Sequence, residues 1–384
     1  MSFAQIIGHE RPIAVLKRAI LSERIAPAYL FVGPPNVGKS RVAHEFAKAV
    51  NCTGHGPSLF GDEAEGDPAS ACDQCDSCRR IDRDSHPDVH LVRPQAKVQA
   101  AGDEEAKDMV IEGAMITTEQ IGDLISQANL KASQARRKIF IVCSAESMNP
   151  ASANRLLKTL EEPPGDTTLV LTTQNLSRLL PTIISRCQSL TFRPAPLSQA
   201  EEGIRTLCPE TDPVVLRSVV ALSGGRIGWA LRLLEHPQVL ELRGKLLDLA
   251  ASLAGRDWFE GMAVTEKLLE AAEDWWLATE SDDFAEKALK ASRDRILRTK
   301  TNEILDILLS WFRDLALLTA GGEQRLVVNA DRLDQLAALA EGRQASKCRR
   351  ACEDIEHSRR QLRGNANLRL AVEVLSFRLI GDLR

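Results

Sequence analysis

The stretch that decides the fold is YLFVGPPNVGKS, residues 29–40. Its first four residues are apolar and end at a glycine, which is typical of a short buried strand. The next eight match the pattern G-x-x-x-x-G-K-[ST] at every fixed position, and apolar residues then recur at helical spacing over 42–50. Strand, glycine-rich loop and helix in this order form the context in which such a loop binds phosphate.

We expect this P-loop to hold a nucleotide through its backbone N–H groups and the positive end of the following helix. Lys39 would reach the β- and γ-phosphates, and Ser40 would hold Mg²⁺. The alternative is a glycine-rich turn that binds nothing. The candidate nucleotide-binding residues are Gly33, Pro34, Pro35, Asn36, Val37, Gly38, Lys39 and Ser40.

The first half of the chain alternates between two kinds of pattern. Short β-branched and aromatic runs predict further strands at 88–92, 138–143 and 169–172. Helical spacing between these runs predicts helices at 120–130 and 149–160. Strands separated by helices indicate an α/β domain whose parallel sheet is covered on both faces.

Nucleotide hydrolysis requires carboxylates beside the phosphates, one for Mg²⁺ and one to activate water. They would follow the strand that ends at Val142, where the chain instead has Cys143 and Ser144. Neither residue is a hard anionic ligand or a carboxylate base. Glu146 comes two to three residues too late to be taken as equivalent. The sequence therefore predicts a site that binds ATP/Mg²⁺ without efficient turnover.

The chain has nine cysteines, and four of them are spaced for a metal. Cys72, Cys75 and Cys78 form a C-x-x-C-x-x-C run, and Cys52 lies at the end of the P-loop helix. Four thiolates suit a closed, structural Zn²⁺ site that would staple a loop to the helix end. An iron–sulfur cluster or empty thiols are the alternatives.

The length of 384 residues predicts two to three domains. We expect an α/β domain over 1–193 with a zinc module at about 52–78, a helical lid over 194–240 and a helical collar over 241–384. Residues 54–71 and 94–113 are acidic and read as surface loops. No apolar run is long enough for a membrane span and no export signal is visible, so we expect a cytoplasmic protein. The net charge of -4 argues against strong DNA binding by bulk charge.

Several motifs in this order resemble the AAA+ clamp-loader subunits of bacterial DNA polymerase III. They are IIGHE (6–10), the P-loop, the three-cysteine run, HPDV (86–89), NRLLKTLEEPP (154–164) and ISRC (184–187). The resemblance is strong over 1–193, looser to about 240, and returns weakly at 361–370. It implies a RecA-like AAA+ domain followed by a lid and an oligomerisation collar.

In function, the resemblance implies sliding-clamp loading on primed DNA during replication. The implied partners are gamma/tau and delta subunits in a ring, the sliding clamp and primer–template DNA, with no membrane. By resemblance, Arg186 is an arginine finger that reaches a neighbouring subunit's ATP site, where its guanidinium would stabilise transition-state charge. Thr172 and Thr173 end a strand where the family has its first nucleotide sensor.

Two subunit types share these motifs, an ATP-hydrolysing gamma/tau motor and a stator that forms a fixed wall of the ring. The missing acidic pair and the short length favour the stator. The motor remains the alternative, as does another AAA+ remodeller such as a helicase loader. The Ser185-Arg186-Cys187 and three-cysteine motifs argue against the helicase loader.

Overall fold

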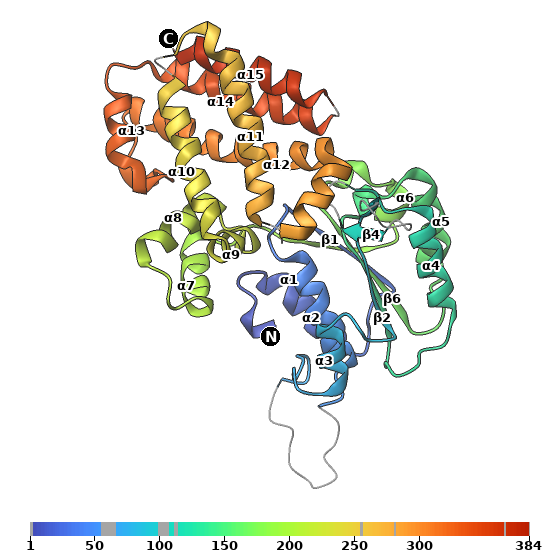
Figure 1. The fold of residues 1–384 in the computed structure, drawn as a ribbon. Coiled ribbons are helices and arrows are strands. Elements are labelled where there is room, and N and C mark those ends of the chain that lie inside the picture. The colour runs from blue at the N-terminus through green and yellow to red at the C-terminus, as the bar shows by residue number, and fades with distance from the viewer. Residues whose placement is uncertain are drawn as a thin grey trace. The chain divides into compact units, whose positions relative to one another are not determined.

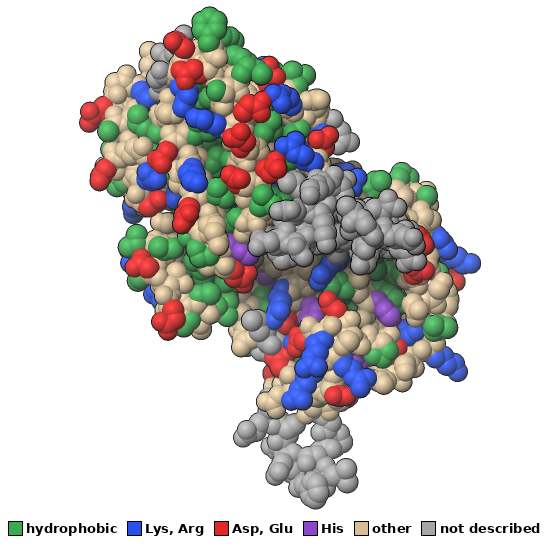
Figure 2. Space-filling view, viewed as in Figure 1, with side chains coloured by type: hydrophobic (Ala, Val, Ile, Leu, Met, Phe, Trp, Pro, Cys, Tyr) green, Lys and Arg blue, Asp and Glu red, His purple; other side chains and the backbone are tan. Residues whose placement is uncertain are grey.

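The computed structural model describes residues 3–54, 67–98, 107–110, 114–253, 256–279, 282–364 and 366–383 (Figure 1). The chain divides into two compact units. The first comprises Met1–Ala96, Ala114–Gly203 and Gly225–Trp229, and the second comprises Lys97–Gly113, Ile204–Gly224 and Ala230–Arg384. Acidic and basic side chains are interspersed over the visible face (Figure 2). The expected division at 193 and 240 stays a prediction.

The first unit is built on a five-stranded sheet in the order β2-β5-β6-β1-β7. All of the recorded strand pairs in it are parallel. The central strands are almost wholly buried, because helices cover both faces. This confirms the expected α/β class. The strands are β1 (Ala28–Val32), β2 (Val89–Val92), β5 (Lys138–Val142), β6 (Thr167–Thr173) and β7 (Gln188–Thr191).

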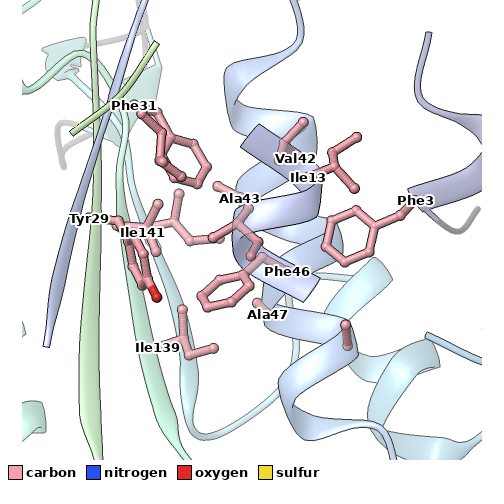
Figure 3. Packing of buried hydrophobic residues seen from close by; sticks show 14 of the residues in the cluster. Phe3, Ile13, Tyr29, Phe31, Val42, Ala43, Phe46, Ala47, Ile139 and Ile141 are labelled. Atoms are coloured by element: carbon pink, nitrogen blue, oxygen red, sulfur yellow. The ribbon is translucent and has the colours of Figure 1, made fainter. Parts of the chain in front are cut away.

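Each face of the sheet has its own apolar core. On one face, Phe46 of α2 packs edge-on against Tyr29 of β1, with ring centroids 5.4 Å apart (Figure 3). On the other face, Leu156 of α5 packs with Phe140 of β5. Alternate residues of each strand thus point to opposite cores. The helices of this unit are α1 (Glu10–Leu21), α2 (Lys39–Asn51), α3 (Asp76–Asp82), α4 (Thr118–Asn129), α5 (Pro150–Glu161) and α6 (Pro181–Ile184), and α7 (Leu197–Leu207) begins in it.

One of the two acidic segments differs from the expectation of a plain loop. Segment 94–113 contains β3 (Gln95–Val98) and β4 (Lys107–Val110), which pair into a small second sheet. The loop prediction was therefore wrong for these residues. The segment as a whole lacks the clear alternation of polar and apolar residues by which strands are recognised in a sequence. Residues 55–66 of the other segment, and residues 99–106 and 111–113, lie outside the described residues.

Beyond β7 the described residues form helices and turns, as expected for the second half of the chain. The long helix α12 packs against α11 and α14 around the buried Trp275, Trp276 and Trp311. Among the described helices, none combines the length and apolarity required to cross a bilayer. The helices are α8 (Pro213–Ser223), α9 (Ile227–Glu235), α10 (Pro237–Ser252), α11 (Gly261–Thr279), α12 (Asp282–Thr319), α13 (Leu333–Ala340), α14 (Ala345–Arg363) and α15 (Leu368–Leu383).

Candidate nucleotide and metal sites

The P-loop connects the carboxyl end of β1 to the first turn of α2. Gly33 donates its N–H to the Thr173 carbonyl at 3.1 Å, which fixes the start of the loop to β6. Gly38 caps α2 with a φ of 107°, a conformation that favours glycine. The backbone at the amino end of α2 is therefore shaped as an anion site.

Lys39 lies within the loop that it is expected to serve. Its ammonium donates to the carbonyls of Gly33 at 2.7 Å and Pro34 at 2.6 Å. Burial lowers the pKa of Lys39 to about 8, although the nearby Glu146 and Cys143 oppose that shift. To reach phosphate, the ammonium must exchange these two carbonyls for the ligand.

His9 supports the loop from the opposite side. Its Nε2 lies 2.6 Å from the carbonyl oxygen of Val37, so this nitrogen carries the proton and donates. The ring also packs edge-on against Phe192, with centroids 4.9 Å apart. Burial lowers the pKa of His9, which keeps the imidazole neutral near pH 7. The geometry gives His9 a role in holding the loop.

Cys143 stands directly beside the expected Mg²⁺ ligand. Its Sγ lies 3.5 Å from Oγ of Ser40, at the end of β5. The next residue, Ser144, donates its N–H to the hydroxyl of Thr172 at 3.1 Å. The neighbouring hydroxyl of Thr173 bonds to the backbone of Asn175. The structure therefore brings Ser40, Cys143 and Thr172 together, whereas the Thr173 hydroxyl is engaged in a local turn.

The structure brings to this site one carboxylate, Glu146, whose spacing after β5 had argued against it. Glu146 is close enough to Lys39 to raise its pKa electrostatically. One of its oxygens accepts the N–H of Gln174 at 3.3 Å, and the other is buried without a hydrogen-bond partner among the described residues. Ser144 has a φ of 52° and begins the short turn Ala145–Ser147. This turn folds the chain back, which spacing along a strand could not reveal.

Arg186 lies just after α6 and is bonded within its own chain. It pairs with Glu161 at the end of α5 and donates to the Thr182 carbonyl at 2.9 Å. About a third of its side chain is exposed (33%). A role as an arginine finger requires the guanidinium to exchange Glu161 for a phosphate supplied by a neighbour.

The four predicted cysteines converge on one point. The Sγ atoms of Cys52, Cys72, Cys75 and Cys78 all lie within 4.8 Å of one another, and none of the four is in a disulfide. The Cys52 and Cys75 sulfurs are 4.0 Å apart. A tetrahedral zinc with Zn–S bonds of about 2.3 Å separates its sulfurs by roughly 3.8 Å, so the set fits that ion.

The backbone and the pKa values of these thiols also suit metal binding. Backbone N–H groups of Cys72, Cys75 and Cys78 point at the sulfurs of Cys52, Cys72 and Cys75, respectively, at 3.3–3.4 Å. Burial opposes ionisation of Cys75, but hydrogen bonds from Thr53 and Cys78 outweigh it and lower its pKa to about 6. Burial raises the pKa values of Cys52 and Cys78. A bound cation would reverse that penalty.

A buried ammonium joins this module to α2, which sequence reasoning did not predict. Lys48 has no exposed surface and pairs with Glu45 at 3.2 Å, Asp82 at 3.1 Å and Asp73. These carboxylates outweigh the effect of burial and raise its pKa. Glu45 and Asp82 also lie near His44 in a metal-like arrangement. Because Lys48 already pairs with both carboxylates and Arg41 also pairs with Glu45, that group serves as an internal ion-pair network.

Two family models match the chain. One, described as "DNA polymerase III, delta subunit", matches residues 8–196, and the other, the C-terminal part of the delta subunit, matches residues 287–379. The chain belongs to the DNA polymerase III clamp-loader subunit family. The P-loop and the cysteine cluster both lie within the first match, and most of α12, α14 and α15 lies within the second.

Individual relatives are similar to parts of this chain. The "DNA polymerase III subunit delta'" of Bacillus subtilis is 31% identical over 62% of this chain and 63% of its own length. That of Pseudomonas aeruginosa is 34% identical over 61% and 66%. Subunit tau of Bacillus subtilis is 27% identical over 71% of this chain and 47% of its own. The chain thus spans just under two thirds of the delta' relatives.

Solved structures are similar only at a distance. A gamma-subunit-related protein of Thermotoga maritima covers 97% of this chain and 99% of its own, with 16% identity and a TM-score of 0.35. The clamp-loader delta protein of Bacillus subtilis covers 96% and 99%, with 10% identity and a TM-score of 0.30. Overlaps at this level carry no argument about function.

Proposed function

We propose that the chain is the delta prime, or stator, subunit of the DNA polymerase III clamp loader, which binds nucleotide with little turnover. The observation that carries the proposal is the thiol of Cys143, 3.5 Å from the Ser40 hydroxyl at the place of a magnesium carboxylate. A neutral thiol is a poor ligand for a hard cation. The two relatives named delta' support the same assignment.

Nucleotide would bind at the amino end of α2. The backbone N–H groups of the loop would surround the phosphates, and Lys39 would leave the Gly33 and Pro34 carbonyls for them. Ser40 would hold Mg²⁺, which neutralises phosphate charge when bound. Thr172 would report the state of the site through its hydrogen bond to Ser144.

The metal held by the four cysteines is proposed to be a structural Zn²⁺. Four thiolates leave no open coordination position, so the ion would stabilise the fold and take no part in chemistry. The small buried cluster around this site consists of Ala71 and the four cysteines themselves. The ion would supply the stability that so small a core lacks.

The proposed partners are gamma/tau and delta subunits in a ring of five, acting in the cytoplasm on the sliding clamp and primer–template DNA. In that ring, Arg186 would leave Glu161 and enter the ATP site of the neighbouring gamma/tau subunit. A guanidinium there stabilises the charge that develops on the transferred phosphoryl group. The chain would thus assist hydrolysis at a site other than its own.

Assembly tests this proposal. The purified chain, mixed with gamma/tau and delta, should form a stable heteropentamer with clamp-dependent ATPase activity. Arg186→Ala should assemble normally and lower the ATPase rate, since one site loses its finger, whereas Arg178→Ala, on an exposed turn nearby, should leave the rate unchanged. Failure to assemble would exclude the clamp-loader role, and an unchanged rate for Arg186→Ala would exclude the finger.

The gamma/tau-type motor is the second candidate, and Glu146 is the observation that favours it. Its partnerless buried oxygen puts a carboxylate near Lys39 despite the missing acidic pair. If Glu146 served hydrolysis, the chain alone would turn over ATP, and Glu146→Gln would abolish that turnover. We expect the chain alone to show neither behaviour.

A further inference from the structure

Four exposed cations gather on the zinc module and the loop beside it. Arg79 lies on α3 and Arg83 directly follows that helix, whereas Lys131 and Arg136 lie in the loop 130–137 that leads into β5. None of the four makes an ion pair with any residue that the structure describes. We call this surface the zinc-module face. Figure 2 shows Lys and Arg side chains over the segment that Figure 1 labels α3.

The zinc-module face is held on a rigid frame. Arg80 of α3 donates to the side chain of Gln134 at 3.0 Å, which joins the helix to the loop. The Asp88 carboxylate accepts backbone N–H groups of residues 133–135 at 2.7–3.0 Å. Asn51, at the end of α2, exchanges two hydrogen bonds with the Arg137 backbone. The loop therefore presents its cations from a fixed backbone.

The acidic side chains in the same region already pair with other cations of this chain. Asp73 and Asp82 pair with the buried Lys48, and Asp76 pairs with Arg80 at 3.1 Å. On the loop side, Asp166 pairs with Arg137 at 3.6 Å. Although Asp73 and Asp82 share one ammonium, the four free cations still leave a local positive excess on a chain whose net charge is -4.

This face is separate from the nucleotide site. The loop enters the amino end of β5, whereas the P-loop leaves the carboxyl end of β1. Both strands are parallel to β6, so their amino ends lie at one edge of the sheet and their carboxyl ends at the other. A ligand on the zinc-module face would leave the P-loop free.

We propose that the zinc-module face binds the phosphate backbone of duplex DNA. Three of its four free cations are arginines, whose planar guanidinium matches phosphate oxygens. Single-strand binding relies on aromatic side chains that stack on bases, and neither α3 nor loop 130–137 contains an aromatic residue. The inference rests on the proposed clamp-loader function and names a contact that the ring would make with DNA.

The test compares two charge-matched variants of the full chain, using fluorescence anisotropy of a labelled random-sequence duplex at low salt. The first variant carries Arg79→Gln, Arg83→Gln, Lys131→Gln and Arg136→Gln. The control carries Lys245→Gln, Lys267→Gln, Arg295→Gln and Arg360→Gln, all exposed and unpaired among the described residues of the second unit. Unchanged zinc content and thermal unfolding would show that both variants are folded.

The first variant should bind the duplex roughly tenfold or more weakly than the wild type. The slope of log K against log salt should become less steep by about 3 to 4, as expected when four phosphate contacts are lost. The control should change less than twofold. Four outcomes would each overturn the proposal. They are equal losses in the two variants, no duplex binding by the wild type, tighter binding of single-stranded DNA, and binding of poly-glutamate in preference to the duplex. Because the chain is tested alone, these results are distinct from a failure to assemble with gamma/tau and delta.

Discussion

The two ends of α2 differ in how many of the groups that a binding site requires come from this chain. The helix has 13 residues, with the P-loop at its amino end and Cys52 at its carboxyl end. At the cysteine end, four sulfurs converge within 4.8 Å and need nothing from outside except the metal. At the P-loop end, Lys39 is bonded to its own loop and Ser40 faces a thiol. One end brings together a complete set of candidate metal ligands, and the other, as we propose, binds nucleotide without efficient turnover.

Removal of a metal ligand should have the largest effect. Cys75→Ser leaves three thiolates, so we expect the zinc content to fall from about one ion per chain to almost none. The thermal unfolding temperature should fall by many degrees, because metal binding contributes directly to folding. Metal analysis and calorimetry would measure this. Cys208→Ser, outside the cluster, is the control. Equal zinc in Cys75→Ser and wild type would contradict the metal site.

Removal of the buried ammonium should have the next largest effect. Lys48→Met leaves Asp73 and Asp82 without this cation and Glu45 with Arg41 alone. Breaking a buried ion pair costs about 3–5 kcal/mol. Denaturant unfolding would measure this, with the exposed Lys245→Met as the matched control. A loss no greater than that of the control would show that the network does not hold the zinc module onto α2.

The smallest predicted effect is a pH dependence at the P-loop. Lys39 has a pKa of about 8 before nucleotide binds, and phosphate favours its charged form, so binding above pH 8 must take up a proton. ATP affinity should therefore fall as pH rises from 7 to 9, by about tenfold at most per unit above the pKa. Titration calorimetry would measure it. In Lys39→Arg, whose side chain is always charged, ATP affinity should depend less on pH. If wild type and Lys39→Arg showed the same pH dependence, titration of Lys39 would not be its cause.

The sequence foretold the parts of both sites that depend on spacing. The P-loop pattern requires fixed residues between a strand and a helix, and the three-cysteine run predicts thiols around one ion, with Cys52 as the fourth. The structure confirms the placement of the loop between β1 and α2 and the convergence of the four thiols. Nucleotide and metal binding stay predictions. The pairing of β3 with β4 was missed because segment 94–113 carries no clear alternation.

Two other residues escaped prediction because their environment comes from distant segments. Lys48 lies on an amphipathic helix, where a lysine normally faces water, and its burial depends on Asp73 and Asp82 arriving from the zinc module. By spacing, Glu146 lies too far beyond β5 to reach the nucleotide site if the chain continues straight after the strand. The left-handed Ser144 turns the chain back toward Lys39.

The most direct test of the central claim is the fate of ATP bound to the isolated chain. The purified protein would be mixed with labelled ATP and Mg²⁺, and both bound and hydrolysed nucleotide would be followed in the same sample. We predict that ATP binds, that Lys39→Ala abolishes binding, and that the bound ATP remains intact over many minutes. Rapid release of phosphate by the wild type, lost in Lys39→Ala, would contradict it and identify a hydrolysing motor.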